Sequence, residues 1–135
     1  ETGLIAFKKY CVVEDCGRVI NPQLVDEQIR GGVVQGIGGA LFEECRYNDR
    51  GELLNGTMSN YLLPTMTDVP DIEVAHIETP TSESELGAKG AGEAGTGAAA
   101  AAIMNAINDA LSPLGGKVTQ QPFTPERILS AIGKI

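Results

Sequence analysis

Residues 86–97 carry five glycines around a single carboxylate, Glu93, and a run of alanines at 98–102 follows directly. Glycine removes side-chain bulk and permits backbone angles that other residues avoid, so this backbone can approach a ligand closely. Alanine is the strongest helix former, which predicts a helix that starts near Glu93. The first N–H groups of a helix lack partners within it and favour an anionic ligand. The segment therefore predicts a carboxylate held beside a small-molecule site.

The length and charge of the chain exclude several classes of protein. With 135 residues it can bury one core, so we expect a single domain over residues 1–135. The formal net charge is −8, whereas binding to nucleic acid requires clustered Lys and Arg, so we expect no nucleic-acid partner. No apolar run reaches the length of a membrane span, and we expect no transmembrane segment.

The cysteines and the single histidine give no sign of a metal site. Cys11, Cys16 and Cys45 have neither the paired spacing of a zinc site nor an even number for disulfides. We expect free thiols in a reducing, cytoplasmic environment. His76 lies in an alternating segment, 72–78, without a neighbouring cluster of ligating residues, which favours a structural role in a strand.

Hydrophobic periodicity predicts an α+β fold, with strands and helices in a single layered domain. Asn21 followed by Pro22 is a typical helix start, and Thr124 followed by Pro125 is another. The expected strands are residues 4–14 and 72–78, with a hairpin across 44–54. The expected helices are residues 22–44, 98–111 and 125–132, and residues 79–92 are expected to form a long loop.

The predicted helix 22–44 contains an unusual number of glycines. Its interior holds Gly31, Gly32, Gly36, Gly38 and Gly39, and each costs on the order of 1 kcal/mol relative to alanine. Close packing of this helix on a sheet would explain them. So would a ligand against the helix, with Gln35 projecting among the glycines. The residues alone leave both explanations open.

Two further interpretations of the segment around Glu93 compete with a catalytic one. Residues 90–95 match the dinucleotide fingerprint G-x-G-x-x-G, but that motif requires a strand ending immediately before Gly90. Glu93 could also be a first-turn glutamate favoured by the helix dipole. As a general base it would need to be ionised and within hydrogen-bond reach of the proton it takes. Lys89 and Gln35 are its candidate polar neighbours.

Several ordered motifs resemble the molybdenum hydroxylase family of xanthine dehydrogenase, aldehyde oxidoreductase and the carbon monoxide dehydrogenase large subunit. They are residues 17–22 (GRVINP), 28–44 (QIRGGVVQGIGGALFEE), 61–65 (YLLPT), 68–70 (DVP), 78–80 (ETP), 87–93 (GAKGAGE) and 124–128 (TPERI). The resemblance covers nearly the whole chain and is specific, because independent motifs agree in order and spacing. It is greatest to the C-terminal molybdopterin-binding region of these large subunits.

The resemblance implies roles for particular residues. In that family the glutamate of K-G-x-G-E is the base beside the molybdenum, which implies this role for Glu93. The glutamine of Q-G-I-G contacts the molybdopterin, and neighbouring glycines lie near it. The cofactor contacts implied are Gln35, Gly36, Lys89, Gly90 and Gly92. No side chain of this chain is implied as a direct metal ligand.

The family also implies cofactors and partners. We expect molybdopterin, in its cytosine dinucleotide form, with molybdenum, and iron–sulfur clusters and FAD on partner subunits or domains. We expect the remainder of the large subunit as a partner and an oligomeric enzyme. By itself the chain should not turn over substrate, as a fragment or separately encoded piece of the enzyme. A non-catalytic binding or assembly module with the family fold is the alternative.

The expected substrate is a small molecule that is hydroxylated with oxygen from water. Members of the family that oxidise carbon monoxide have a Ser-Pro-containing stretch after the glutamate, whereas this chain has Ala94, Gly95 and Thr96. The expected substrates are therefore an aldehyde, an N-heterocycle or a molecule like carbon monoxide, with the first two fitting the resemblance at least as well as the third. A chain cut from a larger subunit is also expected to expose apolar surface where its partner packed.

Overall fold

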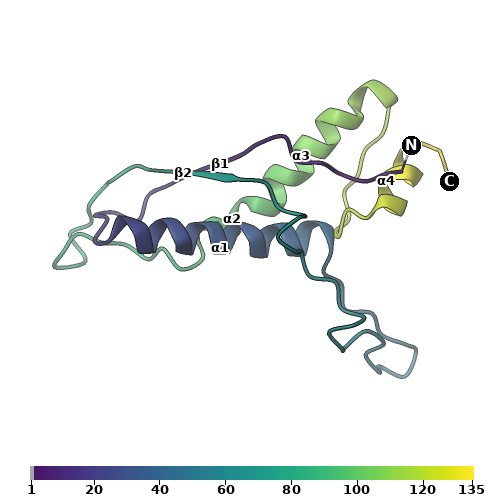
Figure 1. The fold of residues 1–135 in the computed structure, drawn as a ribbon, viewed down its shortest axis with the longest axis horizontal. Coiled ribbons are helices and arrows are strands. Elements are labelled where there is room, and N and C mark those ends of the chain that lie inside the picture. Colours follow the sequence, from purple (N-terminus) through teal and green to yellow (C-terminus); the bar gives the residue numbers. More distant parts are fainter. Residues whose placement is uncertain (1) are drawn as a thin grey trace.

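The computed structural model describes residues 2–135 and has one long helix crossed by shorter elements (Figure 1). The strands are β1 (Tyr10–Glu14) and β2 (Ile72–His76). The helices are α1 (Pro22–Leu41), α2 (Ala94–Gly97), α3 (Ala99–Leu111), a 3₁₀ turn η1 (Ser112–Leu114) and α4 (Pro125–Ala131). The mixture of helices and strands agrees with the α+β prediction.

The two strands form a parallel pair on one side of α1. The register pairs Tyr10 with Ile72 and Glu14 with His76. Both strands are shorter than the apolar patterns predict, since only residues opposite a partner can form ladder hydrogen bonds. Parallel strands need a crossover connection, and α1 lies within it. Figure 1 shows both strands above α1, along its length.

The start of α1 follows the prediction and its end comes three residues early. The side chain of Asn21 accepts a hydrogen bond from the backbone N–H of Leu24 at 3.2 Å, and Pro22 begins the helix. At the other end, the N–H groups of Phe42 and Glu43 both donate to the carbonyl of Gly38. This shared acceptor ends the helical ladder after Leu41.

No helix among residues 2–135 combines the length and the apolarity needed to cross a membrane.

The core forms between α1 and α3 and is closed by the C-terminal segment. Buried side chains recur along α1 and α3 at helical spacing, as expected for two helices packed by their apolar stripes. Phe123, on the segment before α4, is almost completely buried. The buried hydrophobic cluster comprises Val33, Ile37, Ala40, Ile72, Ile103, Ile107, Leu111, Val118, Phe123 and Ile128.

Two helices follow Glu93. α2 is a single turn, Ala94–Gly97, and α3, Ala99–Leu111, agrees with the helix predicted over residues 98–111. A helix does begin directly after Glu93, as predicted, but its four residues give it only a small dipole. The dinucleotide interpretation is excluded, because β2 ends at His76 and no strand immediately precedes Gly90.

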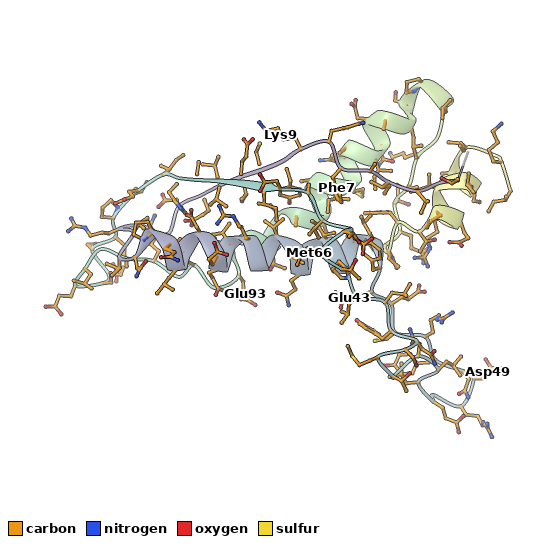
Figure 2. All side chains as sticks on the ribbon, in the orientation of Figure 1. Phe7, Lys9, Glu43, Asp49, Met66 and Glu93 are labelled. Atoms are coloured by element: carbon orange, nitrogen blue, oxygen red, sulfur yellow. The ribbon has the colours of Figure 1, made fainter. Side chains whose placement is uncertain are left out.

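Residues 43–66 form an arm that projects away from the helices. Figure 2 shows Glu43 and Met66 near its base and Asp49 near its far end. The expected hairpin is reduced to one bridge, between Tyr47 and Leu53. Large apolar side chains are exposed along the arm, in agreement with the predicted exposed apolar surface. They are Tyr47, Leu53, Leu54, Met58, Leu62, Leu63 and Met66.

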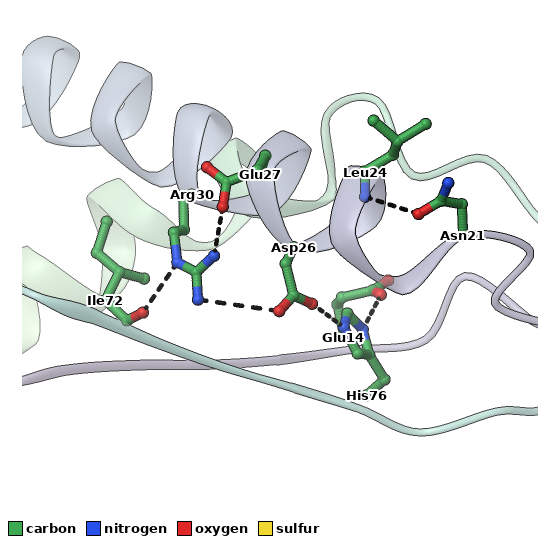
Figure 3. Close-up of polar contacts among 8 residues, drawn as sticks. All are labelled: Glu14, Asn21, Leu24, Asp26, Glu27, Arg30, Ile72 and His76. Atoms are coloured by element: carbon green, nitrogen blue, oxygen red, sulfur yellow. Dashed lines mark hydrogen bonds and ion pairs between the residues drawn. The ribbon is translucent and has the colours of Figure 1, made fainter.

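A charged cluster joins β1, β2 and α1 (Figure 3). His76 Nδ1 lies 2.6 Å from Glu14 Oε1, and His76 Nε2 lies 2.6 Å from Asp26 Oδ1. Arg30 lies 3.8 Å from the Asp26 carboxylate and donates to the carbonyl of Ile72. Glu14 is buried and its Oε2 has no hydrogen-bond partner among residues 2–135. Because a buried carboxylate needs compensation, His76 has the structural role that its strand position predicts.

The three cysteines are free thiols, as predicted. Cys16 is buried, whereas Cys11 and Cys45 are exposed. Burial raises the pKa of the Cys16 thiol, and the nearby Glu14 carboxylate adds to this effect. The Cys16 thiol is therefore held in its neutral form.

Glycines of α1 allow α2 and α3 to approach its backbone. A Cβ at Gly32 would lie 3.1 Å from the Cα of Gly95. A Cβ at Gly95 would collide with the carbonyl oxygen of Ile29, and one at Gly36 would collide with the Cβ of Ala99. The packing explanation thus holds for Gly32 and Gly36, although their partners are helices and not the sheet. Small residues at facing positions bring two helices closer than side chains would otherwise allow.

Substitution of His76 should reveal a pH-dependent contribution to stability. The hydrogen bond to Asp26 raises the pKa of His76 most; burial opposes this shift, and Glu14 adds to it. The stabilisation is therefore fully present below the unfolded-state pKa of about 6.5, and is lost as pH rises through the folded-state pKa. Denaturation midpoints of the wild type and His76→Gln should differ more at about pH 6 than at about pH 9. A difference that does not change with pH would contradict this assignment.

Gly36→Ala should destabilise the fold, because the added methyl group would overlap Ala99. The expected loss in the free energy of unfolding is about 1–3 kcal/mol, typical of overpacking in a core. Urea denaturation measures it. The matched control is Gly39→Ala, also inside α1, where a Cβ would meet no atom within 4 Å. Equal effects of the two substitutions would show that helix propensity, and not packing, decides the outcome.

Candidate functional site

One stripe of α1 alternates glutamine with glycine and is exposed or partly exposed. Gln28, Gly31, Gln35 and Gly39 lie on it, because positions three or four residues apart share a side of a helix, and the exposed Leu24 lies at its N-terminal end. We call this stripe the glycine face. Asp26, which faces His76, lies on the side of α1 toward the strands. The glycine face is therefore available to a group outside the described chain.

Several glycines at or near this face have no structural reason within the chain. A Cβ built on any of them would meet no atom within 4 Å, and none has a positive φ. They differ in this from Gly32 and Gly36, which pack against α2 and α3. The glycines with open space are Gly31, Gly39, Gly90, Gly92 and Gly97. Open glycines leave room for the close approach of a ligand to the backbone.

The segment that carries Glu93 runs beside the glycine face and is bound to α1 at both ends. Gln28 Nε2 donates to the carbonyl oxygen of Gly92 at 2.7 Å. The Thr96 hydroxyl lies 2.9 Å from the carbonyl oxygen of Gly32 and 3.2 Å from Gln35 Oε1. Gln28 and Gln35 are thus two helical turns apart, and each contacts one end of the segment 92–96.

Glu93 is exposed and its side chain makes no capping hydrogen bond to α2. Figure 2 shows it on the opposite side of α1 from the two strands. Its backbone carbonyl accepts from the N–H groups of Thr96 and Gly97, which fixes the start of α2. The carboxylate is therefore free to meet an external group while its backbone is held.

Lys89 pairs with Asp15 and has no ion pair with Glu93. Lys89 Nζ lies 3.2 Å from Asp15 Oδ2, and the Lys89 N–H donates to the carbonyl of Cys16. Hydrogen bonds from Thr79, then from the Gly17 N–H, and finally from Lys89 hold the pKa of Asp15 well below its usual range. Asp15 thus joins the turn after β1 to the beginning of the glycine-rich loop.

The structure brings some of the predicted site residues together and separates others. Gln35 is next to the segment that carries Glu93, and Gly90 and Gly92 are exposed on that segment. Gly36, in contrast, is buried under Ala99, on another side of α1 from the glycine face. Gly36, which the motif predicts as a cofactor contact, therefore packs against α3 in this structure.

Gln28 and Thr96 were not predicted as site residues, although both contact the site backbone or Gln35. Gln28 could have been found from its spacing, since seven residues separate it from Gln35 and place both on one helix face. Thr96 gave no such signal, because its partners on α1 are more than sixty residues away in the sequence.

The described side chains offer hydrogen bonds and a base but no metal-binding cluster. Among residues 2–135, no three His, Cys, Asp or Glu residues lie close enough to hold a metal ion. Glu93 can accept a proton, and the Gln35 amide can donate and accept hydrogen bonds. The site therefore offers one carboxylate and the amides of two glutamines as its polar side-chain groups.

Comparisons with known proteins agree on one family. Residues 1–70 match the molybdopterin cofactor-binding domain family. The nicotine 6-hydroxylase large subunit of Paenarthrobacter nicotinovorans is 48% identical over 130 residues, which are 96% of this chain and 16% of that protein.

Solved structures give the same result. Quinoline 2-oxidoreductase from Pseudomonas putida 86 is 48% identical, with a TM-score of 0.87 over 90% of this chain and 16% of that one. Carbon monoxide dehydrogenase from Oligotropha carboxidovorans is 30% identical, with a TM-score of 0.90 over 98% of this chain and 16% of that one. The chain thus spans about 16% of the length of these relatives.

Gly31→Ala should stabilise the chain when no ligand is bound. Gly31 is inside α1 and a Cβ there would contact nothing within 4 Å, so the alanine gains helix propensity without a collision. The expected gain in the free energy of unfolding is about 0.5–1 kcal/mol. Urea denaturation measures it, with Gly36→Ala as the paired variant. A loss of stability in Gly31→Ala would show that the fold itself requires this glycine.

Proposed function

Because the chain belongs to the molybdenum hydroxylase family, through its molybdopterin cofactor-binding domain, we propose that it forms one wall of the cofactor site. In this proposal Glu93 is the base of an oxidative hydroxylation. The observation that carries it is the exposed Glu93 carboxylate, on a held backbone beside the glycine face of α1.

The residues present fit a molybdopterin group. Gly31 and Gly39 on α1, and Gly90 and Gly92 on the loop, leave open space where any other residue would place a side chain. A broad, polar organic group can contact backbone N–H and carbonyl groups over such a surface. When bound, this cofactor would supply the two-electron oxidation, which none of the twenty side chains can supply alone.

The chain itself would contribute binding and proton transfer. Gln35 would hold the group through its amide, and Gly90 and Gly92 through their backbone. Gly36 would act on the site by letting α1 approach Ala99, which sets where Gln35 lies. Lys89 would hold the beginning of the loop through Asp15 and present positive charge near the group. Glu93 would take up a proton on a carboxylate oxygen as oxygen from water is added to the substrate.

An N-heterocyclic substrate is favoured over an aldehyde or carbon monoxide. The two relatives at 48% identity are named for nicotine and quinoline, both nitrogen heterocycles. The carbon monoxide dehydrogenase is only 30% identical. Residues 94–96 also lack the Ser-Pro stretch expected of carbon monoxide oxidisers. We therefore assign a small aromatic N-heterocycle as the substrate class.

The same proposal extends to the rest of the enzyme. We assign the cytosine dinucleotide form of molybdopterin, with iron–sulfur clusters and FAD on partner subunits. The relative from Paenarthrobacter nicotinovorans is named as a large subunit, which supports an assembly of several subunits. The three free thiols support a reducing, cytoplasmic location.

Glu93→Gln in the holoenzyme that contains this chain tests the proposal. The substitution keeps the size of the side chain and removes its basicity, so kcat should fall by about 10²–10⁴-fold, the range for general-base catalysis. Molybdenum content, measured by elemental analysis, should not change. Glu85→Gln, an exposed glutamate in the same long loop, is the matched control and should leave kcat unchanged.

Near-normal turnover by Glu93→Gln would remove Glu93 from the mechanism. Assays of the wild-type holoenzyme with nicotine, quinoline, an aldehyde and carbon monoxide test the substrate class separately. Turnover of the aldehyde or of carbon monoxide but not of the heterocycles would contradict it. A protein that retains no molybdopterin would support the alternative of a non-catalytic assembly module.

A further inference from the structure

The backbone just before Glu93 has one fixed point that comes from another element. Among residues 2–135, the Gln28 side chain makes the only hydrogen bond that reaches the backbone of residues 90–93 from α1. The donor is Nε2, the acceptor is the carbonyl oxygen of Gly92, and the distance is 2.7 Å. The bond therefore acts one peptide away from the proposed base.

Apart from the Gln28 bond, the backbone of this short stretch makes local hydrogen bonds: Ala94 N–H donates to the Ala91 carbonyl, and Thr96 and Gly97 N–H donate to the Glu93 carbonyl. Before it, the Lys89 N–H donates to Cys16 and the Lys89 ammonium pairs with Asp15. After it, Gly95 packs against the backbone of α1. The four residues between these anchors are Gly90, Ala91, Gly92 and Glu93.

The two glycines of this stretch make a fixed point necessary. Gly90 and Gly92 are exposed and have open space around them, so neighbouring side chains do not restrict their backbone. Glycine has more backbone freedom to lose than any other residue, and an unanchored stretch would sample many positions. The glycines leave room for a ligand, but their freedom would also let Glu93 move. The hydrogen bond from Gln28 on α1 to the Gly92 carbonyl limits this movement.

We infer that Gln28 is a positioning residue, which places the Glu93 carboxylate by holding the Gly92 carbonyl. This inference rests on the proposed function of Glu93 as the base. Gln28 does so through a donor on the rigid α1, whose opposite side is fixed in the core by Ile29 and Val33. Its amide does not need to touch the substrate or the cofactor. Its effect should therefore pass entirely through the position of Glu93.

Gln28→Met in the holoenzyme tests this inference, because it keeps the length and neutrality of the side chain and removes the donor. We expect kcat to fall about 10–100-fold, as misplacement by about 1 Å can cost. KM and molybdenum content should stay close to the wild-type values. Hydrogen exchange of the amides at 90–94 should become faster, while that of residues 32–40 should not. Gln28→Lys restores a donor of sufficient reach and should recover most of the lost kcat.

Two controls separate positioning from a general structural effect. Gln23→Met removes an exposed glutamine in the first turn of α1 whose side chain makes no hydrogen bond within residues 2–135, and should leave kcat and exchange unchanged. In the Glu93→Gln background, Gln28→Met should cause no further loss of kcat, because residues that act as one unit are not additive.

The outcomes that overturn the inference differ from those that overturn the proposed function. Unchanged exchange at 90–94 in Gln28→Met, or a normal kcat beside a defective Glu93→Gln, overturns the positioning role alone. An additive loss in the double variant also overturns it, because Gln28 would then act independently of Glu93. Normal turnover by Glu93→Gln overturns the proposed function, whatever Gln28→Met does.

Discussion

The close approach of α1 to α2 and α3 is the contact on which the rest of the structure depends. Gly32 faces Gly95, and Gly36 faces Ala99, so helix backbones meet where side chains would normally separate them. This approach brings Thr96 within hydrogen-bond distance of the α1 backbone and places residues 92–96 beside the helix. The buried stripes of α1 and α3 then complete the core around the same contact. The same contact between α1, α2 and α3 therefore stabilises the core and positions residues 92–96.

The glycines of α1 fall into two groups, those packed against other helices and those with open space, and their sequence positions do not distinguish the groups. Gly32 and Gly36 are needed because neighbouring atoms occupy the space of a side chain. Gly31 and Gly39 lie one and three residues away, yet a Cβ at either would meet nothing within 4 Å. An interior helix glycine costs on the order of 1 kcal/mol relative to alanine. Packing offsets this cost for the first pair, whereas no contact within residues 2–135 offsets it for the second pair.

The two sides of α1 differ in charge: charged side chains face the strands, and neutral amides face solvent. Toward the strands, Asp26 and the buried Glu14 hold His76 in a charged cluster that ties the sheet to the helix. Toward solvent, Gln28 and Gln35 present neutral amides beside the open glycines Gly31 and Gly39. Lys89 pairs with Asp15 and not with Glu93, so the Glu93 carboxylate has no ion pair within residues 2–135.

The sequence by itself determined the local features: the caps at Asn21 and Thr124, the existence of the main helices and strands, the free thiols and the family. These follow from short-range rules and ordered motifs, which need no knowledge of the fold. Only the tertiary structure decided that α2 is a single turn, that Gly36 packs under Ala99, and that Gln28 reaches the backbone beside Glu93. Each of these depends on the contact between segments about sixty residues apart. Hydrophobic periodicity reports which side of a helix is buried, but it cannot report which distant segment lies against it.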